Sequence, residues 1–158
     1  MEINVRESRR EDMPQVLELI KELASFENKP EAVTTSVEQL QRDGFGEQPQ
    51  FKCFVAEVEE TIHGMALVYF RYSTWKGKTV HLEDLVVRER FRGKGLGIVL
   101  YKKVMSHALE QNVKRVEWVV SEGNTGAIDF YKKSGATIMK DWNTVQFDEE
   151  AIKKFLDS

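Results

Sequence analysis

The stretch LEDLVVRERFRGKGLGIVLYKKVMSHALE, residues 82–110, decides how this chain folds. It begins as an apolar strand, passes through a turn with three alternate glycines, and ends in a helical pattern. In that pattern an apolar residue recurs every four positions, at Leu96, Leu100, Val104 and Ala108. Glycine permits positive φ and close approach to the backbone, so successive N–H groups can form one concavity before the helix. The turn therefore predicts a binding site for phosphate or pyrophosphate.

Two familiar phosphate-binding motifs fit this turn poorly. The P-loop needs Gly-Lys followed by Ser or Thr, but Gly95 follows Lys94. In the dinucleotide fingerprint G-x-G-x-x-G the third glycine comes one residue later than Gly97, and the motif usually follows a first strand. The structural alternative is a tight connection that binds nothing. The strand–turn–helix context and the basic residues at 88, 90, 92 and 94 favour the anion site.

Upstream of the turn, the sequence predicts a run of antiparallel strands. Residues 3–7 alternate like a short strand. FKCFVAEV (51–58), IHGMALVYFRY (62–72) and TVHLEDLVV (79–87) are three further strands, joined by turns at EET and STWKGK. Neighbouring strands joined by such short turns pair antiparallel.

Two helices are predicted between the strand at residues 3–7 and the three longer strands. Ser8 and Glu11 have the spacing of a capping box, and the helix that follows starts near Asp12. The second helix is TTSVEQLQRDG (34–44), with Gly44 past its end.

Downstream of residue 110, the pattern predicts β-α-β units. KRVEWVV (114–120) is a strand, TGAIDFYKKSG (125–135) a helix, TVQF (144–147) a last strand and EEAIKKFLD (149–157) a last helix. Early helices, a strand meander and these units indicate an α+β or mixed α/β fold, a mixed sheet flanked by helices. No linker divides the sequence, so residues 1–158 are expected to form one domain.

Composition narrows the function classes. The chain has 158 residues, 41% hydrophobic and 31% charged, with a net charge of −3. A dedicated nucleic-acid binder is usually basic, so nucleic acid is not the expected partner. A single cysteine, Cys53, excludes an internal disulfide and is expected in the core, while three scattered histidines show no zinc spacing, so no metal is expected. Without a signal-peptide or membrane-length apolar run, a soluble cytoplasmic protein is expected.

Two blocks of sequence resemble one family. RFRGKGLG resembles the Arg/Gln-x-x-Gly-x-Gly/Ala turn of the GCN5-related N-acetyltransferases (GNAT), and EGNTGAIDFYKKSGA (122–136) resembles that family's Asn-x-x-Ala-x-x-Phe-Tyr segment. Further similarities, including LIKELASFE, WKGK and HLEDLVV, resemble the spermidine/spermine (diamine) acetyltransferase branch. The resemblance implies the GNAT fold, with a mostly antiparallel sheet, acetyl-coenzyme A as cosubstrate and a homodimer.

The resemblance also assigns roles to particular residues. The coenzyme would be held by the backbone of one strand, by the glycine turn and by the start of a later helix: Leu85, Val86, Val87, Arg92, Gly93, Lys94, Gly95, Leu96, Gly97, Ile98, Asn124, Thr125, Gly126 and Ala127. The amine site would be lined by Phe26, Glu27, Glu83, Asp84, Glu117, Trp118 and Val119. Tyr131 would be the general acid that protonates the leaving thiolate.

Two adjacent carboxylates interrupt the apolar strand before the turn. A protonated primary amine must lose a proton before it can attack a thioester, and a carboxylate raised in pKa by burial is a suitable acceptor. Glu83 and Asp84 should point to opposite faces of the sheet unless a bulge intervenes. Glu83 is the favoured base or water holder and Asp84 a charge partner. The alternative is a salt bridge at the strand edge.

The sequence leaves the substrate open. A diamine or polyamine is the first choice, with a lysine-like thioether amine or an aminoacyl group as the alternative. The polyamine enzymes have an acid just before the WKGK tryptophan, where this chain has Ser73 and Thr74. A rival from another class is a non-catalytic acyl-coenzyme A sensor, which needs neither Tyr131 nor Glu83.

Overall fold

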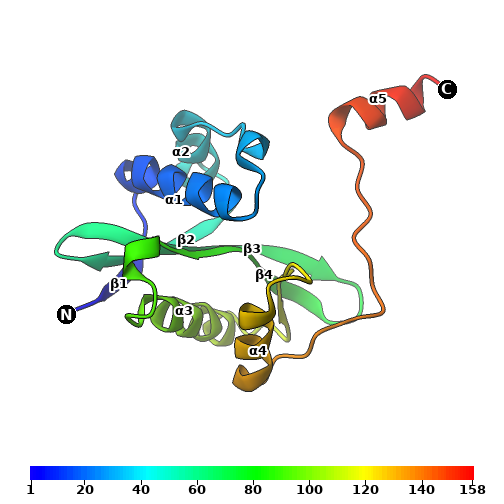
Figure 1. Ribbon diagram of the computed structural model, residues 1–158. Helices are drawn as coiled ribbons and strands as arrows, with labels where there is room; N and C mark the ends of the chain where they lie inside the picture. Colours follow the sequence, from blue (N-terminus) through cyan, green and yellow to red (C-terminus); the bar gives the residue numbers. More distant parts are fainter. The chain divides into compact units, whose positions relative to one another are not determined.

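Five strands form one mixed sheet in the first of two units into which the chain divides. The computed structural model describes residues 1–158, with one unit at Met1–Val119 and a second at Val120–Ser158. The strands are β1 (Asn4–Glu7), β2 (Lys52–Val58), β3 (Thr61–Ser73), β4 (Gly77–Val87) and β5 (Val116–Glu117). They lie in sequence order; β1 to β4 are antiparallel and β5 is parallel to β4 (Figure 1). The predicted mixed, mostly antiparallel sheet is confirmed, although β5 is shorter than predicted.

Helices cover both faces of this sheet (Figure 1). α1 (Met13–Phe26) and α2 (Val37–Phe45) lie on one face, and α3 (Leu96–Glu110) lies on the other. Because side chains alternate along a strand, β2, β3 and β4 contribute to both apolar cores. Three short 3-10 helices join these elements: η1 (Arg10–Asp12), η2 (Pro30–Ala32) and η3 (Glu89–Phe91).

The capping interaction before α1 lies one residue later than the sequence predicts, and it caps η1 rather than α1 itself. The carboxylate of Asp12, rather than Glu11, accepts a hydrogen bond from the Arg9 backbone N–H at 2.7 Å. The Ser8 N–H donates instead to the Cys53 carbonyl at 2.8 Å, which extends the pairing of the first strand. The predicted Ser8–Glu11 capping box is therefore wrong, because sheet pairing takes the backbone of Ser8.

The end of α2 also differs from the prediction. Gly44 lies inside the helix, which continues to Phe45. A Cβ at Gly44 would lie 2.4 Å from the ring of Phe51, so the absent side chain lets the helix approach the ring closely. Gly44 therefore serves packing rather than helix termination.

The second unit contains two helices, α4 (Thr125–Ser134) and α5 (Glu149–Leu156). Gly135 ends α4 in the left-handed conformation with φ of 106°, as predicted. The predicted strand at 144–147 is wrong: these residues form no regular element, and no strand lies in this unit to pair with them. None of the helices in either unit has the length and apolarity to cross a lipid bilayer.

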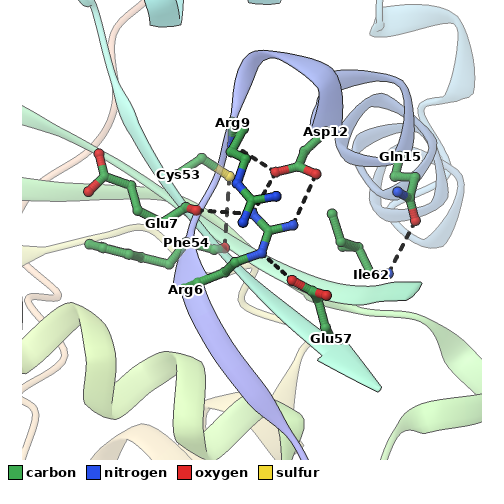
Figure 2. A network of polar contacts seen from close by, with 9 residues as sticks. All are labelled: Arg6, Glu7, Arg9, Asp12, Gln15, Cys53, Phe54, Glu57 and Ile62. Atoms are coloured by element: carbon green, nitrogen blue, oxygen red, sulfur yellow. Dashed lines mark hydrogen bonds and ion pairs between the residues drawn. The ribbon is translucent and has the colours of Figure 1, made fainter. Parts of the chain in front are cut away.

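A charged network ties β1 to β2 and η1 (Figure 2). The Arg6 guanidinium donates to both carboxylate oxygens of Asp12, at 2.7 and 3.1 Å, and also to Glu57. Their side chains are only 20%, 7% and 13% exposed. Burial by itself raises the pKa of Asp12, but hydrogen bonds from Arg6 and the Arg9 backbone outweigh it and lower that pKa. The network therefore holds Asp12 ionised although its side chain is largely buried.

Cys53 lies in the core between the sheet and α1, as predicted. It is 2% exposed, and burial raises the pKa of its thiol to about 12. Since the thiolate is the reactive form, Cys53 behaves as a small apolar side chain rather than a nucleophile.

Candidate functional site

The turn between β4 and α3 has the backbone that an anion site needs. Gly93 has φ of 76° and Gly95 has φ of 95°, so two alternate residues adopt the left-handed region. A Cβ at Gly93 would meet no atom within 4 Å, and no side chain caps the N-terminus of α3 at Gly95. The first N–H groups of α3 therefore lack a side-chain acceptor, and the dipole of the helix favours an anion there. Gly97 lies inside α3.

The basic side chains of this turn differ in what they contact. Arg88 faces α1, and its Nη2 lies 3.4 Å from a carboxylate oxygen of Glu18. Arg90 and Lys94 lie over the ring of Phe91, at 5.5 and 5.1 Å from its centroid. No carboxylate forms an ion pair with Arg90 or Lys94, so these two charges are the ones available to an anion.

Arg92 is turned toward the sheet and α1. Its Nε donates to the Val87 carbonyl at 3.0 Å, and its guanidinium lies over the Phe26 ring, 5.2 Å from the centroid. Phe26 is the last residue of α1 and is 55% exposed, and Glu27 follows it as the C-cap. Arg92 thus connects the glycine turn, which is predicted to bind the coenzyme, to the end of α1, which is predicted to line the amine site.

The edge of β4 next to the turn has no strand partner. β5 pairs with only two residues, both in the first half of β4. The Arg88 N–H donates to the His63 carbonyl in β3 at 2.7 Å. Because alternate residues direct their backbone groups to opposite sides, Val86 also faces β3, whereas Leu85 and Val87 face the open edge. Of the three predicted coenzyme contacts in this strand, these two have backbone groups on the open side.

A β-bulge on β4 places Glu83 and Asp84 on the same face. Leu67 lies opposite Asp84 and Val68 lies opposite Leu82, so Glu83 has no partner in the register. Leu67 belongs to the core beneath α1, whereas Val68 and Leu82 belong to the core beneath α3. Asp84 shares the face of Leu67, and Glu83 is opposite to its neighbour Leu82, so both carboxylates lie on the α1 side.

These carboxylates form a site of negative charge together with Glu27. Burial, together with the negative charges of Glu83 and Glu27, raises the pKa of Asp84 to about 6. The side chain of Glu83 is 49% exposed, so a ligand can reach it. Three carboxylates that repel one another favour binding of an ammonium group, and Asp84 is poised to change charge near pH 6.

Sequence reasoning missed two residues of this site, His81, which contacts Glu83, and Arg71, which contacts His81. His81 is 7% exposed, and its Nε2 lies 3.9 Å from Glu83 Oε2. Its Nδ1 lies 3.2 Å from Arg71 Nη1, and that nitrogen is 2.8 Å from Glu117 Oε1. The two-residue period of the strand could have placed His81 beside Glu83, but nothing in the local sequence indicates the contact with Arg71.

The residues after Glu117 lie elsewhere. Trp118 packs with the core beneath α3, edge-on to Tyr101 at a centroid distance of 5.7 Å. Val119 is 77% exposed. Of the predicted amine-site residues at 117–119, the structure brings only Glu117 into the chain of contacts that reaches Glu83.

In the second unit, the predicted coenzyme residues form the first turn of α4. Asn124 is the N-cap, and its Oδ1 accepts a hydrogen bond from the Ala127 N–H at 3.3 Å. Gly126 lies in open surroundings, with no atom within 4 Å of an added Cβ. Tyr131 lies two turns later, with its ring 5.8 Å from that of Phe130. The helix is as predicted, and the catalytic role of Tyr131 stays a prediction.

Comparison with known proteins identifies the family. Residues 13–136 match the model of the acetyltransferase (GNAT) family. The chain is 37% identical over 163 residues to a thialysine N-epsilon-acetyltransferase of Bos taurus, covering 96% of each chain. It is 33% identical over 159 residues to spermidine/spermine N(1)-acetyltransferase-like protein 1 of Homo sapiens, covering 94% of this chain and 23% of that protein.

Solved structures agree on the fold. An integron cassette protein from the mobile metagenome of V. cholerae superposes with a TM-score of 0.81 at 22% identity, covering 100% of this chain and 99% of that one. An aminoglycoside acetyltransferase from an uncultured soil metagenomic sample gives a TM-score of 0.76 at 20% identity, covering 92% and 95%. The chain therefore belongs to the GNAT family of acetyltransferases, in the branch that includes the thialysine and spermidine/spermine acetyltransferases.

Proposed function

We propose that this N-acetyltransferase transfers the acetyl group of acetyl-coenzyme A to the terminal amine of a lysine-like small molecule such as thialysine. The observation that carries the proposal is the β4 bulge, which puts Glu83 and Asp84 on one face with Glu27. Arg71 borders this acidic site and pairs with the next acid, Glu117, at 2.8 Å, so a positive charge stands where a long polyamine would need a further free carboxylate. The preference moves from the diamine that the sequence favoured to the lysine-like alternative, which the thialysine relatives also support.

The first unit has the features that the coenzyme requires. The glycine turn offers N–H groups of α3, with Arg90 and Lys94 nearby, to the pyrophosphate. Leu85 and Val87 offer backbone groups on the open edge of β4 to the pantetheine arm and the acetyl carbonyl. Acetyl-coenzyme A supplies the activated thioester when it binds.

The protein's own residues then handle the protons. A primary amine has a pKa near about 10.4, so it arrives as ammonium and is bound by the carboxylates of Glu27, Glu83 and Asp84. Glu83, which is exposed at the bulge, accepts the proton directly or through water. Tyr131 donates a proton to the departing thiolate. Holding both reactants in one site lowers the entropic part of the barrier.

The test is release of the coenzyme product across a panel of amines. Lysine and cadaverine form a matched pair that differs only in the carboxylate, and thialysine, putrescine and spermidine complete the panel. We expect kcat/KM to be highest for thialysine or lysine. Higher values for spermidine and putrescine would restore the polyamine assignment. Coenzyme binding without turnover of any amine would favour the acyl-coenzyme A sensor. The predicted homodimer is tested separately by light scattering of the eluted protein.

Replacing Gly95 by alanine should weaken coenzyme binding about tenfold. An L-residue at φ of 95° costs about 1–2 kcal/mol, and relief of that strain turns the N–H groups away from the anion. Gly77→Ala is the matched control, because Gly77 has φ of 81° and open surroundings in the β3–β4 turn. Titration calorimetry with coenzyme A should show the loss for Gly95→Ala alone. Equal losses in both variants would contradict a role in binding.

Activity should fall on the acid side near pH 6. Asp84 is ionised above that value and protonated below it, and only the ionised form helps to bind ammonium. The Glu27 charge is one of the causes that raise the pKa of Asp84, so Glu27→Gln should move the acid limb of kcat/KM to lower pH. The measurement is a pH profile of amine kcat/KM in both proteins. An acid limb that stays in place, or moves upward, would count against this account.

A further inference from the structure

A chain of charged and polar contacts runs from β5 to the bulge in β4. Arg115 Nε lies 3.5 Å from Glu117 Oε2, and the other oxygen of Glu117 lies 2.8 Å from Arg71 Nη1. Arg71 Nη1 lies 3.2 Å from His81 Nδ1, and His81 Nε2 lies 3.9 Å from Glu83 Oε2. His81 is the only buried member, at 7% exposure, so its ring is fixed while the Glu83 side chain can turn.

The contact with Arg71 decides where the proton of His81 lies. A guanidinium can only donate, so His81 Nδ1 must accept. The single ring proton of a neutral imidazole is then on Nε2, the nitrogen that faces Glu83. In this form His81 can donate a hydrogen bond to a carboxylate, but it has no free lone pair with which to take a proton from the substrate.

We propose that His81 is a positioning residue, which holds the Glu83 carboxylate toward the amine by donating a hydrogen bond from Nε2 and is itself oriented by Arg71 and Glu117. The contact of 3.9 Å closes to hydrogen-bond length when the exposed Glu83 side chain turns toward the ring. The proposal rests on the proposed function, because it matters to the reaction only if Glu83 accepts the proton.

The surroundings of His81 favour the neutral ring. Burial lowers the pKa of His81, and the positive charge of Arg71 lowers it as well, against the opposing effects of Glu83 and Glu117. Tyr69 lies against the ring from β3, with its centroid 5.1 Å away. A protonated ring would place two donors, Nδ1–H and the Arg71 guanidinium, against each other.

The tautomer can be measured without any substrate. A long-range proton–nitrogen spectrum of the 15N-labelled protein at pH 7.5 should show His81 as the Nε2–H form, assigned by loss of its signals in His81→Gln. In Arg71→Leu the preference should disappear and the two neutral forms should mix. An Nδ1–H tautomer or a charged ring in the unaltered protein would overturn the proposal, whatever the enzyme acetylates.

Kinetics test the consequence for Glu83. His81→Phe should lower kcat about tenfold, the scale of one hydrogen bond to a charged group, with KM for acetyl-coenzyme A unchanged. His81→Gln, whose amide can donate from nearly the same place, should recover most of the activity. His107→Phe is the control, because His107 is equally buried at 6% but packs against Phe54 on the α3 side. Equal losses in His81→Phe and His107→Phe, or no recovery with Gln, would contradict a positioning role.

A combined variant separates this proposal from the proposed function. When Glu83→Gln is already present, adding His81→Phe should cause no further loss of kcat. A further tenfold loss would show that His81 acts elsewhere than on Glu83. If Glu83→Gln alone leaves kcat intact, the assignment of the base fails, while the nitrogen spectrum still decides the geometry of His81.

Discussion

Glu83→Gln should lower kcat for amine acetylation by about 10²–10⁴-fold, the usual contribution of a general base. Glutamine keeps the size of the side chain and a polar end at the bulge, but it cannot accept the proton of an ammonium group. Glu83 is 49% exposed and belongs to neither apolar core, so the KM for acetyl-coenzyme A and the melting temperature should stay close to those of the unaltered enzyme. Steady-state rates at saturating coenzyme, with lysine and thialysine as acceptors, measure the effect.

The control for this variant is Glu60→Gln, in the turn between β2 and β3. Glu60 is an exposed acid just before β3, whereas the bulge lies opposite Leu67 and Val68 inside β3, so the same change of charge should leave kcat within about twofold. Asp84→Asn provides a second comparison, because it lies on the same face. If Asp84→Asn abolishes turnover while Glu83→Gln retains it, the proton acceptor is Asp84.

Arg6→Met should lower the free energy of unfolding by about 3 kcal/mol at pH 7. Methionine fills much of the space of the arginine stem but leaves Asp12 and Glu57 half-buried without their shared cation. Their mutual repulsion then adds to the cost of desolvating each carboxylate. The network joins β1 to η1 and β2, so its loss also loosens the start of α1 (Figure 2). Urea unfolding followed by circular dichroism measures the difference.

The pH dependence of the stability difference between the unaltered protein and Arg6→Met tests whether the loss of the Arg6–Asp12 pair causes it. Against the effect of burial, hydrogen bonds from Arg6 and the Arg9 backbone lower the native pKa of Asp12. Asp12 therefore contributes its full share to the free energy of unfolding above the ordinary carboxyl pKa of about 3.9. This stabilisation is lost as the pH falls through the lowered pKa of Asp12 in the folded protein. The gap between the two proteins should shrink below about pH 4. Arg42→Met, which removes an exposed pair 72% and 40% accessible, should change stability by less than about 1 kcal/mol at any pH.

Local sequence signals were sufficient for the anion turn and most elements. Alternate glycines before a helical stripe predict the positive φ values at Gly93 and Gly95, because only glycine adopts them cheaply. Short turns between apolar runs likewise predict the antiparallel order of β2, β3 and β4. The place of Gly44 inside α2 could not be predicted, because it depends on a close approach to Phe51, and a contact between separate elements leaves no periodic pattern in the sequence.

The parts of the site that could not be predicted depend on register and on distant pairings. Whether Glu83 and Asp84 share a face depends on one unpaired residue opposite Leu67 and Val68, and either register suits the same sequence pattern. Arg71 meets His81 only because β3 and β4 extend together as a long hairpin. Trp118 turns to the α3 core because β5 ends at Glu117. Each outcome is fixed by tertiary pairing rather than by local propensity.

The burial of Cys53 affects how coenzyme release can be assayed, because the released coenzyme ends in a sulfhydryl group. Each catalytic cycle releases one such group, and dissolved oxygen can oxidise two of them to the coenzyme disulfide. An accessible cysteine thiolate could attack that disulfide, forming a mixed disulfide and releasing one coenzyme thiolate. The chain's sole cysteine is shielded and stays protonated in neutral buffer, so the enzyme should accumulate no such adduct. A colorimetric disulfide dye should accordingly count product sulfhydryls alone, and native protein without coenzyme should leave the dye colourless until denaturant is added.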